Sequence, residues 1–158
     1  MSAPTKIDVV LFDIGGVIVQ MGDFAMLGPF GDIRESDGIR KVWLESPIVD
    51  AHERGLIEPT DFAARMVETY SINCAPSEFL DRCIAWHGDL FVDVEDTIAA
   101  IDPSLRIGCL SNTCAYHWAN QPCAARIDEL FETQFLSFRM GAMKPEGAIY
   151  RAVADQLD

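Results

Sequence analysis

Basic side chains are scarce in this sequence of 158 residues: 12 lysines and arginines stand against 25 aspartates and glutamates, and the formal net charge is −13. Proteins that bind nucleic acids or anionic membranes need a basic surface, so we expect neither kind of partner. A small phosphorylated metabolite is a different case, because a few cations in one pocket are enough to bind its phosphate.

Long apolar runs are also absent. No stretch approaches the roughly 18 consecutive apolar residues of a transmembrane helix, and residues 1–6 lack the charged and apolar parts of a secretory signal peptide. We therefore expect a cytoplasmic protein. Hydrophobic residues still make up 49% of the chain, which is enough to bury the core of one domain, with or without an insertion.

The five cysteines are an odd number and show no Cys-x-x-Cys spacing, so we expect neither a disulfide framework nor a structural zinc site. We interpret them as reduced thiols. Cys114 lies close in sequence to candidate catalytic residues described below, but a thiol nucleophile needs a positioned base and the sequence identifies none. We therefore interpret Cys114 as a packing residue.

Apolar runs alternate with helical patterns, which indicates an α/β fold with one large insertion. Strands are predicted over residues 7–12, 106–110 and 134–138, and a final helix over 145–157. Between the first two strands, apolar residues recur at helical spacing, which predicts a helical cap over residues 22–88, with helices over 39–44, 59–70 and 77–86. Residues 1–21 and 89–158 would then form a core with a Rossmann-like parallel sheet. The glycines at or near the cap boundaries, Gly22 and Gly88, are either hinges or ordinary turn residues.

A carboxylate stands at the end of the first predicted strand. Asp13 follows the apolar run of residues 9–12 and is followed at once by Gly15 and Gly16. Open α/β sheets place their chemistry at the carboxyl ends of parallel strands, and the glycines allow a tight turn that approaches a ligand. We therefore predict that Asp13 is a nucleophile, since a carboxylate can form a covalent intermediate.

Two further segments supply groups that suit a phosphate. Ser111 and Asn112 close the second predicted strand and offer a hydroxyl and an amide, while Lys144 offers a compact positive charge. In isolation, Ser111 and Asn112 would be an ordinary helix N-cap and Lys144 a surface residue. Their occurrence in this order after Asp13 favours a site for phosphoryl transfer, in which Ser111 and Asn112 bind the substrate.

Together, the residues from Asp13 to Gly16 and the segments Leu110-Ser111-Asn112-Thr113 and Met143-Lys144-Pro145 resemble the motifs of the haloacid dehalogenase (HAD) superfamily. The resemblance implies a hydrolase in which Asp13 forms an aspartyl-phosphate. It implies that Asp13 and the backbone carbonyl of Gly15 bind Mg²⁺. It also makes Lys144 a catalytic residue that offsets the charge of the carboxylate and of the phosphoryl group.

The fourth motif of that superfamily, an acidic pair that completes the metal site, would follow the last predicted helix, within which the sequence ends at Asp158. We therefore expect either a shortened or partly processed form in which C-terminal strands of the core are missing, or a second polypeptide that covers the exposed edge of the sheet. In the superfamily the missing strand lies beside the first strand. Its absence would uncover the edge of that strand and allow self-association through it.

The sequence departs from the usual phosphatase pattern at Gly15, where the superfamily commonly has an aspartate that acts as general acid and base. Glycine at this position resembles the bacterial sugar-phosphate phosphatases typified by α-D-glucose-1-phosphate phosphatase, as does the cap segment His52-Glu53-Arg54-Gly55. This resemblance implies that the segment faces the active site, where Arg54 would contact a sugar hydroxyl or phosphate. An exposed helix end is the other interpretation of Arg54. We interpret His87 and His117 as packing or surface residues.

The leading hypothesis is a Mg²⁺-dependent phosphomonoester hydrolase that acts on a small sugar phosphate or similar metabolite. One alternative is a 2-haloacid dehalogenase, which uses the same aspartate without a metal, although Gly15 disfavours it. The second alternative is a catalytically compromised binding domain, because the sequence lacks both the second acid and the terminal metal ligands.

Overall fold

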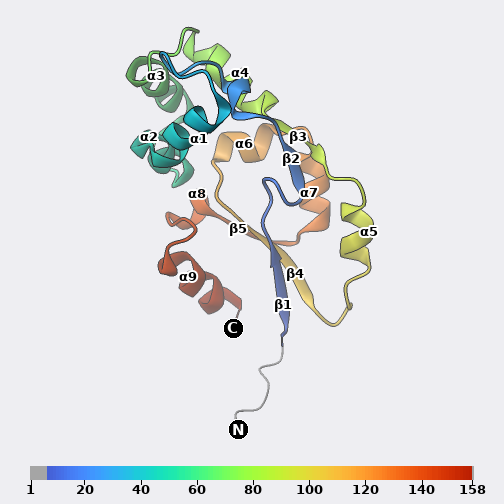
Figure 1. Cartoon of the computed structure of the whole chain (residues 1–158). Helices are drawn as coiled ribbons and strands as arrows, with labels where there is room; N and C mark the ends of the chain where they lie inside the picture. The colour runs from blue at the N-terminus through green and yellow to red at the C-terminus, as the bar shows by residue number, and fades with distance from the viewer. Residues whose placement is uncertain (1–6, 158) are drawn as a thin grey trace.

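The computed structural model describes residues 7–157, so Met1–Lys6 and Asp158 lie outside the described residues. A three-stranded parallel sheet forms the core, with the strand order β1 (Val9–Phe12), β4 (Arg106–Ser111) and β5 (Thr133–Leu136). The predicted α/β fold with a parallel sheet is therefore confirmed. Among the described strands, β1 and β5 are the two edges of this sheet, as Figure 1 shows.

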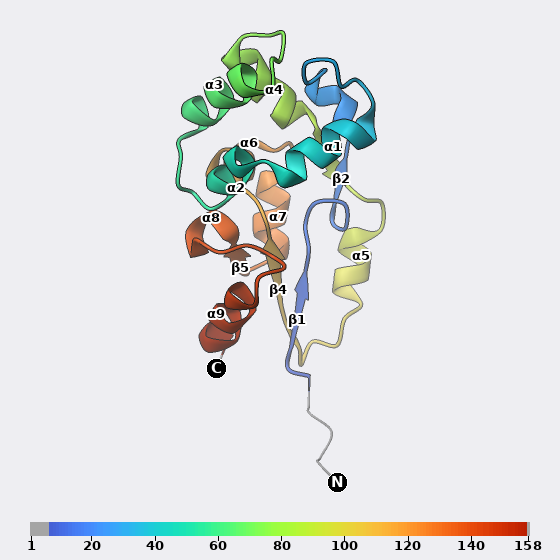
Figure 2. The same cartoon turned by 60° about the vertical axis from the view of Figure 1, so that its left-hand side comes forward.

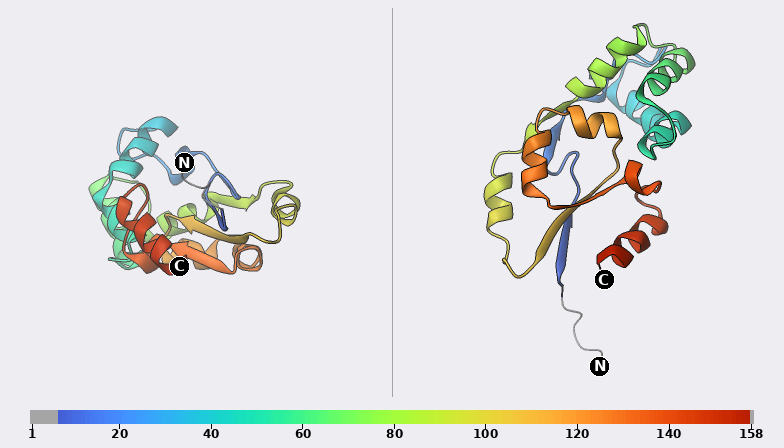
Figure 3. Two further views of the ribbon diagram at one scale, coloured as in Figure 1. Left: turned by 90° about the horizontal axis from the view of Figure 1, so that it is seen from below. Right: turned by 180° about the vertical axis from the view of Figure 1, so that it is seen from behind.

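Helices cover both faces of the sheet, because β4 and β5 alternate apolar side chains between two hydrophobic clusters. On one face, Cys109 and Leu136 pack with residues of α5 (Val94–Ala99), α6 (Ala115–Asn120) and α7 (Ala124–Leu130). On the other face, Leu110 and Phe135 pack with residues of α9 (Gly147–Leu157). Figure 3 shows α9 on the opposite side of the sheet from α5 and α7.

A separate helical layer, which we call the cap, stands beyond the ends of β1 and β4. It comprises η1 (Phe24–Leu27), α1 (Ser36–Glu45), α2 (Pro47–Glu53), α3 (Pro59–Thr69) and α4 (Pro76–Ala85). The cap has its own hydrophobic core, which includes the fully buried residues Ile39, Phe62, Met66 and Phe79. In Figure 2 the carboxyl ends of β1 and β4 point towards the cap, so the cap covers the end of the sheet where α/β proteins place their ligands.

Among the described residues, no helix is long and apolar enough to cross a membrane.

Two short antiparallel strands join the cap to the core, β2 (Val19–Met21) and β3 (His87–Leu90). Gly22 donates from its backbone N–H to the Trp86 carbonyl at 2.8 Å, and Trp86 Nε1 donates to the Gly22 carbonyl at 2.6 Å. A Cβ atom on Gly88 would lie 3.1 Å from the Gln20 carbonyl oxygen. The two glycines thus allow the connections to approach closely. The sequence analysis missed these strands, because neither Val-Gln-Met nor His-Gly-Asp-Leu forms an apolar run.

The sequence analysis also missed α2, whose last residue, Glu53, lines the site described below. The local signal is present: Ser46 Oγ accepts hydrogen bonds from the backbone N–H groups of Ile48 and Val49, and Pro47 occupies the first helical turn. Further differences are at element ends. β5 stops at Leu136, because α8 (Ser137–Met140) begins there, and α9 begins at Gly147 instead of residue 145.

Candidate active site

The carboxyl ends of β1 and β4 bring Asp13 and Ser111 to the same end of the sheet, because these strands are parallel neighbours. Lys144 reaches them from the loop before α9. Its Nζ atom lies 2.7 Å from Asp13 Oδ1 and donates a hydrogen bond to the Leu110 carbonyl at 2.9 Å. A carboxylate, a hydroxyl and an ammonium from three separate segments therefore meet at one place.

Asp13 is positioned by a tight turn. Its Oδ1 atom accepts a second hydrogen bond from the Ile14 backbone N–H at 2.8 Å, while its side chain keeps 46% exposure. Gly16 closes the turn with a φ of 77°, a conformation that favours glycine, and its N–H donates to the Val19 carbonyl at 2.8 Å. Because both hydrogen bonds to the carboxylate use Oδ1, Oδ2 has no hydrogen-bond partner among the described residues.

The side-chain amide of Asn112 contacts the main chain of Lys144. Its Nδ2 atom donates to the Lys144 carbonyl at 2.9 Å, and its Oδ1 atom accepts from the Lys144 backbone N–H at 2.8 Å. Both ends of the amide are thus engaged with the main chain of Lys144. We interpret Asn112 as a positioning residue for Lys144, whereas the Ser111 hydroxyl, with one long contact of 3.4 Å to the Asn112 carbonyl, is available to a substrate.

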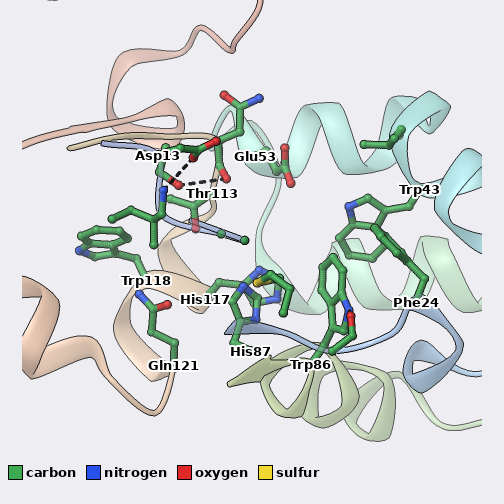
Figure 4. A pocket seen from close by; sticks show the side chains of 18 of the residues that line it. Asp13, Phe24, Trp43, Glu53, Trp86, His87, Thr113, His117, Trp118 and Gln121 are labelled. Atoms are coloured by element: carbon green, nitrogen blue, oxygen red, sulfur yellow. Dashed lines mark hydrogen bonds between the residues drawn. The ribbon is translucent and has the colours of Figure 1, made fainter. Parts of the chain in front are cut away.

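These residues line a cavity of about 490 Å³ between the core and the cap. The core contributes Asp13, Gly15, Ser111, Asn112, Lys144 and also Trp118, whereas the cap and its connections contribute three aromatic residues, Phe24, Trp43 and Trp86, together with the charged Arg40 and Glu53. Figure 4 shows these three aromatic rings grouped at one side of the pocket and Asp13 at the other. The cavity can therefore hold a small molecule with one anionic end and one less polar end.

Glu53, the last residue of α2, also lines this cavity. Burial raises the pKa of its carboxyl to about 7; the neighbouring Asp50 carboxylate acts in the same direction and the Lys144 ammonium in the opposite one. Figure 4 shows the Glu53 carboxylate inside the pocket, between Asp13 and Trp43 in this view. The sequence analysis gave Glu53 no role, because its approach to Asp13 depends on how the cap docks.

Arg54 does not line the cavity. Its guanidinium donates to Asp50 at 2.9 and 3.0 Å, to both carboxylate oxygens of Glu146, and to the Gly141 carbonyl at 3.4 Å. These hydrogen bonds lower the pKa of Glu146 and raise that of Arg54. The expected contact between Arg54 and a substrate is therefore replaced by a clamp between cap and core, since all its donors point at protein acceptors.

Three histidines meet at the contact between cap and core. The ring of His117 lies 4.6 Å from that of His87 and 6.5 Å from that of His52, and the His52 ring stacks on Phe62 at 4.1 Å. Burial lowers the pKa of all three, and that of His117 falls to about 3 with help from the other two. His87 and His117 are therefore neutral packing residues of the cavity wall.

Cys114 is also buried beside the site and caps α6, with its Sγ atom accepting from the His117 backbone N–H at 3.4 Å. Burial raises the pKa of its thiol to about 11. A reactive cysteine needs the opposite shift, because the thiolate is the nucleophile. The structure thus agrees with the interpretation of Cys114 as a packing residue.

The oxygen donors around Asp13 are of the kind that Mg²⁺ prefers, but they are few. Among residues 7–157, no group of three or more histidines, cysteines, aspartates or glutamates could hold a metal. Two hard oxygen donors are present, the Asp13 carboxylate and the Gly15 carbonyl, which accepts no hydrogen bond within the described chain. Mg²⁺ in proteins often uses one or two carboxylates, several waters and a substrate phosphate. The site therefore fits a Mg²⁺ ion that binds together with a phosphate.

No protein-family model and no curated protein matches this chain. Solved structures do. A HAD family enzyme from Bacteroides thetaiotaomicron, in complex with magnesium and inorganic phosphate, matches with a TM-score of 0.74 and 22% identity over 96% of this chain and 79% of that chain. A predicted HAD-like family hydrolase from Porphyromonas gingivalis matches with a TM-score of 0.73 and 20% identity, over 96% and 77% of the two chains.

A more distant match is L-2-haloacid dehalogenase from Xanthobacter autotrophicus. Its TM-score is 0.64 at 17% identity, over 96% of this chain and 65% of that chain. The identities are low in all three cases, so the comparisons concern the fold. The chain has the HAD-like fold, with a Rossmann-type core.

Proposed function

We propose that this protein is a Mg²⁺-dependent phosphomonoester hydrolase that acts on a small sugar phosphate or similar metabolite. The main observation behind this proposal is that Lys144 Nζ lies 2.7 Å from Asp13 Oδ1 on the wall of a cavity of about 490 Å³. The presence of magnesium and phosphate in the similar structure from Bacteroides thetaiotaomicron supports this proposal. The motif likeness to the bacterial sugar-phosphate phosphatases supports the substrate class.

In this mechanism Asp13 attacks the phosphorus atom of the ester with its unpartnered Oδ2 oxygen and forms an aspartyl-phosphate. Lys144, held by the Leu110 carbonyl, places its ammonium beside the carboxylate and offsets the negative charge that gathers there. The Ser111 hydroxyl donates to a phosphoryl oxygen. A bound Mg²⁺ ion, held by Asp13 and the Gly15 carbonyl, would neutralise charge on the phosphoryl oxygens.

Residues of the cap determine which organic group of the ester fits in the cavity beside the phosphate. The aromatic side of the cavity suits the less polar faces of a sugar ring, because carbohydrate C–H groups pack well on aromatic rings. Buried histidines on the cavity wall, neutral at physiological pH, exclude water without adding charge.

The test is release of inorganic phosphate from a panel of sugar phosphates and other small phosphomonoesters, with and without Mg²⁺. We expect Mg²⁺-dependent release by the wild-type protein and none by Asp13→Asn, which keeps the shape of the side chain but removes the nucleophilic charge. Retained activity in Asp13→Asn would contradict the proposal. Halide release from a 2-chloro acid would support the dehalogenase alternative instead.

A further inference from the structure

The reaction proposed above needs a proton donor that the turn after Asp13 does not supply. When the ester P–O bond breaks, its electron pair goes to the leaving oxygen, and an alkoxide is a poor leaving group unless a proton arrives with it. The residues that follow the nucleophile are Ile14, Gly15 and Gly16, none of which carries an ionisable side chain. The donor must therefore come from another part of the cavity.

Few groups on the cavity wall have a proton to give at neutral pH. His87 and His117 have lowered pKa values and are unprotonated bases there. The Lys144 ammonium is engaged with Asp13 and the Leu110 carbonyl. Arg40 also lines the cavity, but an arginine guanidinium does not give up its proton in proteins. Among the described residues that line the cavity, Asp13 and Glu53 are the only carboxyl side chains. Since Asp13 is the nucleophile, Glu53 is left as the candidate acid.

Three successive residues at the end of α2, namely Glu53, Arg54 and Gly55, hold this part of the cap against the core. The buried Ser137 hydroxyl lies 2.6 Å from the Glu53 carbonyl, 2.8 Å from the Thr113 carbonyl, and accepts from the Thr113 N–H at 2.8 Å. Arg54 binds Glu146 of the core, and Gly55 packs so closely that a Cβ atom there would lie 2.7 Å from the Phe138 carbonyl oxygen. The main chain of Glu53 is thus tied to the loop that follows β4, beside Ser111.

We propose that Glu53 is the general acid and base of the hydrolysis, supplied by the cap, an inference that rests on the proposed phosphatase function. In the first step, an Asp13 oxygen forms a bond to phosphorus, the bond from phosphorus to the ester oxygen breaks, and the Glu53 carboxyl proton moves to that oxygen to release the alcohol. In the second step, Glu53 takes a proton from water as the water oxygen bonds to phosphorus. The bond from phosphorus to Asp13 then breaks, which releases phosphate and restores both carboxyl groups.

The surroundings of Glu53 suit both roles. An acid-base group works best when its pKa lies near the working pH, and the Glu53 carboxyl meets that condition with a pKa of about 7. The charged and titratable groups nearest to it are Asp50 on its own helix, Lys144 from the loop before α9, and the buried Cys114 thiol at the start of α6. Asp13, Arg40, His87 and His117 line the same cavity. Docking of the cap on the core thus places the proton donor in the cavity that holds the nucleophile.

The experiment compares Glu53→Gln with wild type on two phosphate esters. The phenolate of p-nitrophenyl phosphate leaves without a proton, whereas the alkoxide of glycerol 1-phosphate needs a proton to leave. We expect kcat/KM on glycerol 1-phosphate to fall by about 10²-fold or more. The nitrophenyl ester should lose far less in its first step. It should instead show a burst of nitrophenol equal in amount to the enzyme, because the aspartyl-phosphate then lacks its base.

The matched control is Glu146→Gln, which weakens the Arg54 clamp and leaves the cavity carboxyls unchanged. It should reduce activity on both esters by the same factor and show no burst. If Glu53→Gln behaves in this way, Glu53 only docks the cap and the inference is wrong. If the wild-type protein hydrolyses neither ester while remaining folded, the proposed function itself is wrong. This outcome is distinguishable from failure of the Glu53 inference alone, in which the wild-type protein is active.

A measurement without turnover tests the same inference. The infrared C=O band of a protonated carboxyl group should be present in wild type at pH 6, disappear as the pH is raised through about 7, and be missing from Glu53→Gln. Loss of the Glu53 band near pH 4.5, the ordinary value for a glutamate, would overturn the assignment.

Discussion

The side-chain amide of Asn112 pairs with the peptide group of Lys144 through two hydrogen bonds, one donated by Nδ2 at 2.9 Å and one accepted by Oδ1 at 2.8 Å. The loop that carries Lys144 is thereby fastened to the end of β4. Lys144 in turn reaches Asp13 at the end of β1. One amide therefore sets the distance between the cation and the nucleophile, although the two lie 131 positions apart in the sequence.

Replacing Asn112 by alanine leaves the N–H and carbonyl groups of Lys144 without these partners. We expect a loss of about 1–3 kcal/mol in the free energy of unfolding and, because a displaced catalytic group is costly, a fall of about 10²-fold in turnover. Denaturant unfolding and phosphatase assays measure the two effects. Asn120→Ala is the control, since Asn120 makes a similar hydrogen bond, from Nδ2 to the Tyr116 carbonyl, on the exposed side of α6. Equal effects of the two variants would contradict the positioning role.

Gly55 and Gly141 both have a positive φ, but only Gly55 packs closely against a neighbouring backbone. Substitutions at the two positions therefore distinguish the cost of backbone strain from an effect on cap docking. Gly55 has a φ of 72° and would place a Cβ atom 2.7 Å from the Phe138 carbonyl oxygen, whereas Gly141 has a φ of 65° and open space around it. Gly141→Ala should cost about 1–2 kcal/mol through its backbone conformation alone. Gly55→Ala should cost more and should lower phosphatase activity, because it pushes the segment of Glu53 away from α8. The prediction fails if the two variants are equally stable and equally active.

The histidine cluster makes stability depend on pH. His52, His87 and His117 all have pKa values in the folded protein below the usual 6.5, so the unfolded chain binds more protons below that pH. The free energy of unfolding should therefore decrease as the pH falls from about 6.5 towards 5, by up to about 1.4 kcal/mol per pH unit for each such histidine. Denaturant unfolding at a series of pH values measures this slope.

Glu53 contributes to the same pH range with the opposite sign, because its pKa is raised and the folded protein holds its proton up to about 7. The slope should accordingly be steeper in Glu53→Gln and shallower in His117→Asn, which removes the most strongly shifted histidine. An unchanged slope in His117→Asn would show that His117 is not buried in its neutral form.

Magnesium should bind weakly alone and more tightly with phosphate. The chain offers the Asp13 carboxylate and the Gly15 carbonyl as oxygen donors, so the remaining positions must be filled by water or by a phosphate oxygen. Calorimetric titration of Mg²⁺ into the protein with and without inorganic phosphate measures the coupling, which thermodynamics requires to be mutual. Asp13→Asn should abolish it. Tight Mg²⁺ binding without phosphate would point to further ligands and contradict this description of the site.

Local patterns in the sequence were sufficient to predict the α/β fold. The apolar runs of β1, β4 and β5 and the helical periodicity of α3, α4 and α9 arise from burial of one face of each element, which is visible over a few residues. The likeness to HAD-like structures agrees with that prediction. Elements without such a period, namely β2, β3 and α2, were missed because they are short and are defined by their partners or their caps.

The sequence by itself determined that Asp13, Ser111, Asn112 and Lys144 come close together, since residues at the carboxyl ends of adjacent parallel strands and in the loops beside them share one end of a sheet. Only the tertiary structure decided what Asn112, Arg54 and Glu53 contact. The side chains of Asn112 and Arg54 form hydrogen bonds to other residues of the protein, while the Glu53 carboxyl lines the cavity and has a raised pKa. The reason is physical: these roles depend on how a cap with its own core docks on the sheet, and burial, ion pairing and shifts of pKa arise from contacts between segments that no local pattern records.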